Sequence, residues 1–443
     1  MQPAPHFVLA LALVVSLTVA VAAWAEVDPS LPSQAPEPTA PWVTEVEALI
    51  DQQAFEQARQ RLAMARLSGA DPDRVAVLAK VLDAQQEAQL AALSRELDAL
   101  IDDQDLDQAQ QVLVQLIALG ADQTTIVAHR QAIDNRLRYG RHQPGEVFHD
   151  PWLQATPDET RHPPHGPAMV VLPQGRFMMG SGRFEKGHKD NEAPRHRVTI
   201  ASGFAVGQTE ITVGQFRAFV EATGHRSDAE RRGRASVYDP RTRRITERPG
   251  MDWRLDFTGQ RADDAHPVIR VSWRDAQAYV AWLSEMTGER YRLLSEAEFE
   301  YALRAGQQWR FPWGEDTPHE AVENVAGEAD RSPTDARWAV SLPDYGDGHW
   351  GPAPVGRFQA NDFGLFDMGG NVSEWTQDCW HDNFVRAPKD GSAWVNQGCD
   401  QRVVRGGAWT STPALARAAH RRARPNDWAD VRVGFRVARE LAP

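Results

Sequence analysis

This sequence of 443 residues has few cysteines and no excess of basic residues. It has two cysteines, Cys379 and Cys399, and 48 Lys and Arg residues against 61 Asp and Glu, for a formal net charge of −13. Because a nucleic-acid partner needs a basic face that neutralises phosphates, the acidic balance argues against such a partner. A zinc site built from the two cysteines and His381 is also disfavoured, because no fourth ligand stands at a usable spacing.

Basic residues are also absent before the apolar run that extends from Phe7 to Ala25. The run ends in Ala23-Trp24-Ala25, a small-x-small pattern typical of a cleavage site, so we predict a signal peptide over residues 1–25. Its length also suits an uncleaved anchor, because about 20 apolar residues span a bilayer. Either outcome places the rest of the chain in the periplasm or the extracellular space. Membrane association requires that the segment stays uncleaved.

The loop between Cys379 and Cys399, CWHDNFVRAPKDGSAWVNQGC, is rich in turn-forming and aromatic residues. In an exported protein the two thiols meet an oxidising compartment, so we predict that they form a disulfide. The alternative is a pair of buried thiols that do not react with each other.

Proline marks two linkers. Residues 26–42, which include EVDPSLPSQAPEPTAP, have a proline density that disfavours both helix and strand. A second linker, residues 139–167, is rich in Pro and His. The linkers separate a region over residues 43–138 from a larger region over residues 168–443.

The region 43–138 contains two similar copies of one sequence. VEALIDQQAFEQA (46–58) matches LDALIDDQDLDQA (97–109), and GAD (69–71) matches GAD (120–122), each at an offset of 51 residues. The helical spacing of the apolar residues predicts two amphipathic helices per copy, a helical hairpin that stacks on its neighbour. Such a pair of hairpins serves either as a spacer or as an array that binds a protein partner.

The larger region has frequent Gly, Trp and Pro and short regular elements. Three helices are predicted, over residues 212–223, 274–287 and 296–305. The last follows Ser295 and has Glu298 three residues on, which is the pattern of a capping box. We predict an α+β domain with a small sheet.

Eight motifs of this region resemble, in order and spacing, the formylglycine-generating or sulfatase-modifying factor family. They are MVVLPQGRFMMGS (169–181), NEAPRHRVTIASGFAVGQTEITVGQF (191–216), HPVIRVSWRDAQAYVAWLS (266–284), YRLLSEAEFEYALRAG (291–306), FPWGE (311–315), GGNVSEW (369–375), RVVRGGAW (402–409) and VGFRVAR (433–439). They cover about residues 168–440, and eight collinear motifs make chance similarity implausible. The resemblance implies an α+β domain of low regularity, related to the C-type lectin fold and preceded here by the α-helical repeats.

The resemblance also implies two calcium sites. The first would use the carboxylates of Asp367 and Glu374 and the carbonyls of Gly370 and Val372. The second would use the side chains of Asn324 and Asp347 with the carbonyls of Val325 and His349. Oxygen ligands of this kind suit Ca²⁺, and two bound ions would hold a domain poor in regular structure rigid. The alternative is that these acidic loops merely face solvent.

The resemblance does not extend to the catalytic centre. Active members of the family carry two copper-binding cysteines after a Gly-Gly turn, and thiolate is the ligand that selects Cu(I). On that pattern Ser411 and Ala416 occupy the cysteine positions, and Ala408 replaces a serine. A hydroxyl and a methyl group cannot replace two sulfur ligands, so we expect neither copper nor a catalytic residue here. Iron chemistry like that of ergothioneine-pathway relatives is disfavoured too, because the helical region offers only His129.

The same segment, VVRGGAWTSTPALARAAHRRAR (403–424), concentrates arginine in an acidic chain. The resemblance places Arg405 and residues 417–424 beneath the family's pocket, where guanidinium groups can fork onto carboxylates and carbonyls. We predict that most of these arginines are internal and that one or two face the cleft. The candidate cleft residues are Trp375, Trp409, Arg405 and His420, the last being either a structural or a catalytic group.

Three functions follow from these observations. The first is a non-catalytic, exported module that binds a peptide or small ligand in the cleft and a protein partner through the repeats. The second is an enzyme with altered chemistry that resembles the family's maturation factor for pyoverdine precursors. The third, true formylglycine generation, is disfavoured by the missing cysteines.

Overall fold

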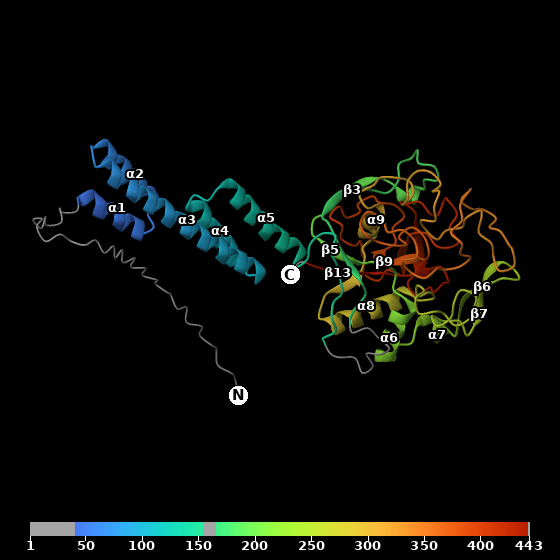
Figure 1. Ribbon diagram of the computed structural model, residues 1–443. Helices are drawn as coiled ribbons and strands as arrows, with labels where there is room; N and C mark the ends of the chain where they lie inside the picture. Colours follow the sequence, from blue (N-terminus) through green and yellow to red (C-terminus); the bar gives the residue numbers. More distant parts are fainter. Residues whose placement is uncertain (1–39, 154–164, 442–443) are drawn as a thin grey trace, which may run out of the picture. The chain divides into compact units, whose positions relative to one another are not determined.

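The computed structural model describes residues 40–153 and 165–441. The predicted signal peptide and most of the first predicted linker lie outside the described residues. The chain divides into two compact units, Met1–Gln89 and Leu90–Pro443, and the boundary falls inside helix α3 (Pro72–Asp102) (Figure 1). Within the described ranges, no helix combines the length and the apolar character needed to cross a bilayer.

The N-terminal part of the chain is helical. The first unit contains α1 (Pro41–Asp51), α2 (Phe55–Leu67) and the first part of α3. The second unit begins with the rest of α3 and continues with α4 (Leu106–Ala118) and α5 (Gln123–Tyr139). A shift of 51 residues carries α2 onto α4 and the first residue of α3 onto the first residue of α5.

The repeated sequence therefore carries a repeated backbone. Gln53 and Gln104, which are 51 residues apart, are both left-handed, with φ of 58° and 63°. Gly69 and Gly120 repeat the next turn with φ of 83° and 85°. Each copy holds three helical segments, because α3 continues from the third segment of one copy into the first segment of the next. The prediction of a two-helix hairpin is wrong for this reason.

The rest of the second unit is built on small sheets, which confirms the predicted α+β class. A five-stranded antiparallel sheet has the order β1-β2-β5-β13-β8, with bounds Val147–Phe148, Met169–Leu172, Phe204–Gly207, Val437–Glu440 and Tyr291–Leu293. A four-stranded sheet has the order β11-β10-β9-β12, with bounds Arg421–Pro425, Gln401–Arg405, Ser373–Cys379 and Val433–Gly434. Two further hairpins pair β3 with β4 and β6 with β7, with bounds Gly175–Met179, His196–Ile200, Arg234–Asp239 and Arg244–Pro249.

All three predicted helices of this region are present. They are α6 (Val213–Thr223), α8 (Trp273–Thr287) and α9 (Glu296–Arg304), with the short α7 (Asp228–Arg232) after α6. Each of the three follows a hydroxyl residue, Thr212, Ser272 or Ser295, that forms a capping box with the third helical residue. The boxes satisfy amides that would otherwise lack partners, so these helix starts are specified locally.

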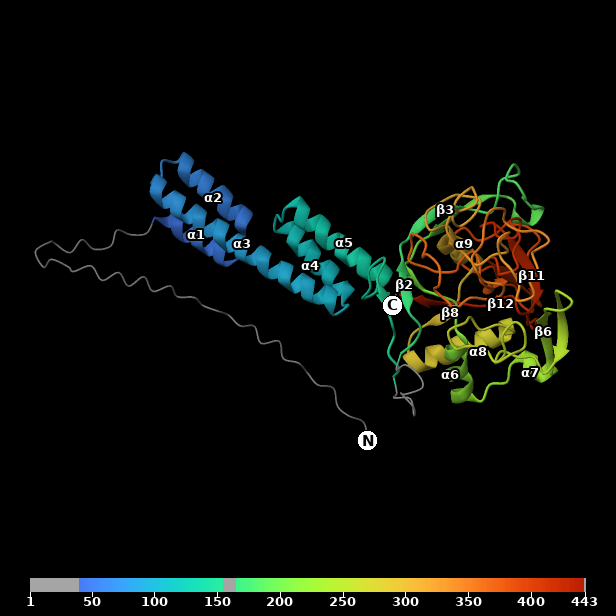
Figure 2. The ribbon, with the colours of Figure 1, turned by 45° about the vertical axis from the view of Figure 1, so that its right-hand side comes forward.

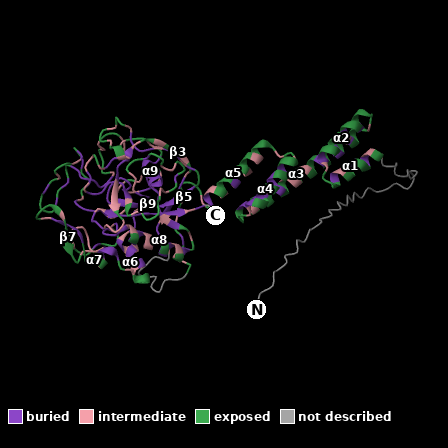
Figure 3. Ribbon diagram, turned by 180° about the vertical axis from the view of Figure 1, so that it is seen from behind, coloured by how far each residue is buried: buried purple, intermediate pink, exposed green. Residues whose placement is uncertain are grey.

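Aromatic rings of α6 and α8 pack against each other and against Phe435, which lies between β12 and β13. The ring centroids of Phe219 and Tyr279 are 5.6 Å apart, and those of Tyr279 and Phe435 are 5.4 Å apart. Figure 2 shows α6, α7 and α8 together on one side of the domain, and Figure 3 shows that its buried residues fill the interior between loops. Long loops can keep one shape here because they enclose this core.

Candidate functional site

The predicted disulfide is present. Cys379, the last residue of β9, is bonded to Cys399 in the loop that precedes β10. The described residues include no free cysteine. A thiolate site for a soft metal is therefore absent from this part of the chain.

Ser411 and Ala416, which the resemblance assigns to the family's cysteine positions, are both buried after β10. The Ser411 side chain accepts a hydrogen bond from the Ala408 amide at 2.9 Å, and its carbonyl accepts one from the Ala326 amide at 3.1 Å. Ala416 packs in a small apolar cluster with Val325. Each of the two positions thus has a neighbour within residues 325–326, and the side chains there are a bonded hydroxyl and a methyl group.

The four candidate cleft residues are interior residues, which corrects their prediction as cleft walls. Trp375, Trp409, Arg405 and His420 are each at most 1% exposed. The Trp375 indole donates to the Val271 carbonyl at 3.0 Å. Side chains this deeply buried hold the fold together and cannot touch a ligand without rearrangement.

The buried arginines form ion pairs, as the arginine-rich segment predicts. Arg417 donates two hydrogen bonds to Glu192, and Arg421 binds both oxygens of Glu296 at 2.7 Å. Arg405 pairs with Glu300 on α9. These contacts, bidentate for Arg417 and Arg421, join β10, β11 and the loop between them to segments more than 100 residues away in sequence.

His420 stands among these cations. Burial is the main reason that its pKa falls to about 2, and the charges of Arg422 and Lys189 lower the pKa further. Neither ring nitrogen has a hydrogen-bond partner among the described residues. A histidine held neutral at physiological pH cannot act as a general acid, so a structural role suits it better than a catalytic one.

The first predicted calcium set does not suit the ion as it stands. Both carboxylate oxygens of Glu374 bind the Arg436 guanidinium at 2.7–2.9 Å, and both side chains are buried. Asp367 accepts the Gly356 amide through one oxygen and leaves the other oxygen without a partner. Gly370 and Val372 flank Asn371 in the same loop. A cation here would have to compete with a fixed guanidinium charge.

The second calcium set is closer to what Ca²⁺ requires. Asp347 accepts the amides of Val325 and His349 at 2.9 and 2.8 Å, so these residues lie together with Asn324. The side-chain oxygen of Asn324 is buried without a partner. Burial first, and the charge of Asp330 second, raise the pKa of Asp347 to about 8. An oxygen-ligated cation would relieve both features, although no group of three His, Cys, Asp or Glu side chains within the described ranges is arranged for a metal.

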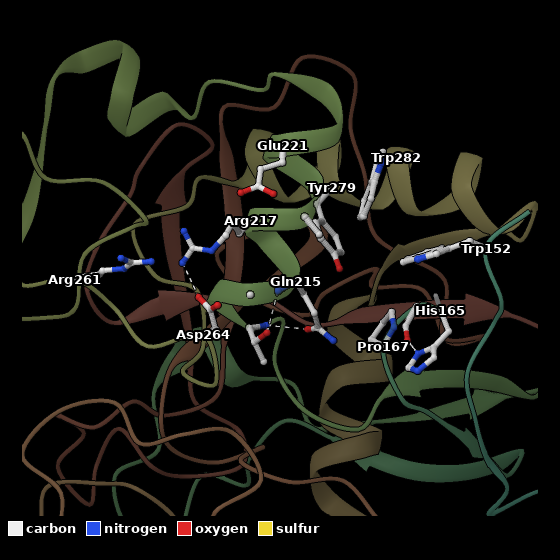
Figure 4. Close-up of a pocket in the computed structure, with 14 residues that line it drawn as sticks. Trp152, His165, Pro167, Gln215, Arg217, Glu221, Arg261, Asp264, Tyr279 and Trp282 are labelled. Carbon is white, nitrogen blue, oxygen red and sulfur yellow. Dashed lines mark hydrogen bonds and ion pairs between the residues drawn. The ribbon is translucent and has the colours of Figure 1, made fainter. Parts of the chain in front are cut away.

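A cavity of about 570 Å³ lies elsewhere, beside α6 and α8 (Figure 4). Trp152, Trp282 and Pro167 lie at one end of it, and Arg217 and Arg261 lie at the other. Its lining includes no residue of the segment 403–424 and none of the predicted site residues. The sequence did not predict this cavity, because the aromatic residues of α8 have the spacing that is typical of a helix face buried in the core.

Comparisons with known proteins agree with this geometry. Residues 154–441 match the sulfatase-modifying factor enzyme 1-like domain. The formylglycine-generating enzyme of Streptomyces coelicolor is 31% identical over 322 residues, which cover 66% of this chain and 95% of that enzyme. The inactive Cα-formylglycine-generating enzyme 2 of Mus musculus is 30% identical over 311 residues, 65% of this chain and 90% of that protein. The structure of PvdO from Pseudomonas aeruginosa matches with a TM-score of 0.52 and 36% identity, over 68% of this chain and all of that one.

Proposed function

Since this chain belongs to the sulfatase-modifying factor family, we propose that it is an exported, non-catalytic member that binds a peptide or protein ligand. The observation that carries this proposal is the state of the family's cysteine positions. Ser411 and Ala416 are buried and offer no sulfur, and the two cysteines of the chain are bonded to each other. Without a thiolate, tight Cu(I) binding has no basis at this place.

The helical repeats add a second binding surface to the proposal. Residues 41–139 hold sixteen acidic and nine basic side chains, so this part of the chain is acidic. Its exposed apolar side chains include Leu67 and Val77 in the first copy and Val114 and Val127 in the second. A protein partner in the exported compartment is the proposed occupant, and the repeats would tether it to the larger domain.

Mass spectrometry of a sulfatase-type cysteine peptide tests the loss of chemistry. We expect no conversion after incubation of the peptide with the protein, copper and oxygen. The matched variant carries Ser411→Cys and Ala416→Cys, and it should gain Cu(I) binding because it supplies two thiolate ligands at the positions that the resemblance assigns to the family's cysteines. Loss of sulfur with gain of an aldehyde in the unmodified protein would refute the proposal.

One observation favours a second candidate, an enzyme with altered chemistry. The 36% identity with PvdO extends over all of that chain and exceeds the identity with the formylglycine-generating enzymes cited above. This candidate requires a reactive group outside the cysteine positions. A secondary-metabolite gene cluster next to the gene of this protein would favour the enzyme over the binding role. So would chemical modification, in vitro, of the metabolite that such a cluster makes.

A further inference from the structure

The cavity beside α6 and α8 has a different chemistry at each end. Trp152 and Trp282 form an apolar end, with ring centroids 5.7 Å apart, and Pro167 lies near them (Figure 4). Arg217 and Arg261 lie at the opposite end, and Tyr279 and Gln215 lie between (Figure 4). A volume of about 570 Å³ is within the range of small-molecule sites. Its occupant must therefore be apolar at one end and polar at the other.

Three polar groups of the cavity have no partner in the described structure. The hydroxyl of Tyr279 points into the cavity in Figure 4 and forms no hydrogen bond with another described residue. The Gln215 side chain uses its oxygen to accept the Thr212 amide at 3.0 Å, which leaves its NH₂ group free. Arg261 is exposed and forms no ion pair or side-chain hydrogen bond with another described residue. Because the Tyr279 hydroxyl and the Gln215 amide face the cavity, a ligand could supply hydrogen-bond acceptors to both.

The cavity lining carries two guanidinium groups, those of Arg217 and Arg261, and two carboxylates, those of Asp264 and Glu221, so an anion must bind to one particular guanidinium. Arg217 binds Asp264 at 2.6 Å, so that carboxylate is neutralised and does not repel a second one. The Arg261 guanidinium remains as a free, forked donor, the geometry that binds a carboxylate with two hydrogen bonds. The free NH₂ of Gln215 requires an acceptor such as an amide carbonyl.

From this arrangement we infer that the cavity binds an acylated apolar amino acid through its free carboxylate. The side chain would contact Trp152 and Trp282, the acyl carbonyl would accept from Gln215 or Tyr279, and the carboxylate would bind Arg261. The C-terminal residue of a peptide and a small N-acyl amino acid share this chemistry. The inference rests on the proposed binding function and gives it a location, away from the former cysteine positions.

Calorimetric titration with N-acetyl-L-phenylalanine and with its carboxamide tests the inference. We expect the acid to bind about tenfold more tightly than the amide, because only the acid offers a charged acceptor to Arg261. Arg261→Gln should abolish that preference, and Tyr279→Phe, which keeps the ring, should weaken binding by about fivefold. Arg244→Gln is the matched control, because it removes an exposed arginine of β7 that does not line the cavity.

A tetrapeptide that ends in phenylalanine separates the two ligand sources. Affinity at least equal to that of the acetylated amino acid indicates a peptide C-terminus, and much weaker binding indicates a small acyl amino acid. Absence of binding at concentrations up to about 10 mM, or equal binding of acid and amide, would overturn the inference. The peptide oxidation assay reports separately on the loss of chemistry, so that proposal can stand when this one fails.

Discussion

Individual buried ion pairs connect distant segments of this domain, as hydrogen bonds between strands do in more regular domains. Arg417 is 1% exposed and contacts Glu192, which is fully buried, as well as Glu185. Ser181 also donates to Glu192 at 2.6 Å. The carboxylate therefore depends on several donors from separate loops, and the guanidinium is the charged one among them.

We expect Arg417→Leu to destabilise the larger unit by about 3–5 kcal/mol, because it leaves the Glu192 charge buried without its cation. Urea unfolding followed by tryptophan fluorescence measures this change. Arg244→Leu, on the exposed strand β7, should change the free energy of unfolding by less than about 0.5 kcal/mol. A similar small effect for Arg417→Leu would show that the pair contributes little to the fold.

Asp347 makes stability depend on pH. Its pKa of about 8 exceeds the value near 4 of an unfolded chain, so the folded state holds a proton that the unfolded state has released. The contribution is complete below about pH 4 and is lost as the pH rises toward 8, at up to about 1.4 kcal/mol per pH unit. In chelator, the free energy of unfolding should therefore fall from pH 5 to pH 8, by about that slope at most, and Asp347→Asn should flatten the fall.

The same pH series, repeated with added calcium, tests the second predicted calcium site. An ion at the second predicted site would hold Asp347 ionised, so calcium should raise the melting temperature more at about pH 8 than at about pH 5. Asp347→Asn should remove this difference, whereas Glu374→Gln, in the first set, tests the competing location. A melting curve of the unmodified protein that is identical with calcium and with chelator would contradict the calcium proposal.

At the scale of elements, local signals in the sequence were sufficient to predict the three helices of the larger region. Capping boxes at Thr212, Ser272 and Ser295 mark helix starts that depend on neighbours three residues away. The repeat was also evident from the sequence, but the number of helices in each copy was not. The helix α3 (Pro72–Asp102) runs from one copy into the next without a turn, and no turn-forming residue marks the passage. The burial of the candidate cleft residues Trp409 and Arg405 could not be predicted, because it depends on partners distant in sequence, such as Glu300 for Arg405.

The disulfide joins the end of β9 to the loop that leads to β10. The bond closes a loop over a sequence separation of 20 residues. Restricting the unfolded chain in this way should contribute about 3 kcal/mol, so replacing both Cys379 and Cys399 with alanine should lower the free energy of unfolding by that amount. The denatured, unreduced protein should contain no free thiol in a titration, and finding two would contradict the pairing.

At the scale of the whole molecule, the two units have separate cores. Val46, Leu62 and Leu82 are buried in the first unit, and Leu97, Leu113 and Leu116 are buried in the helical part of the second. The boundary between Gln89 and Leu90 lies just before residue 92, which is 51 residues after the first residue of α1. Each copy can therefore satisfy its apolar side chains from within its own unit.

A protein that starts at Leu90 should accordingly keep the melting temperature of the larger unit and its affinity for N-acetyl-L-phenylalanine. It retains the last part of α3 with α4 and α5, so the apolar faces of the second copy remain covered, and every residue that lines the cavity is present. Binding of a protein partner that needs both copies should be lost. Calorimetric melting of the shortened and full-length proteins measures the first point, and a shortened protein that aggregates or melts several degrees lower would show that the first copy supports the fold of the second unit.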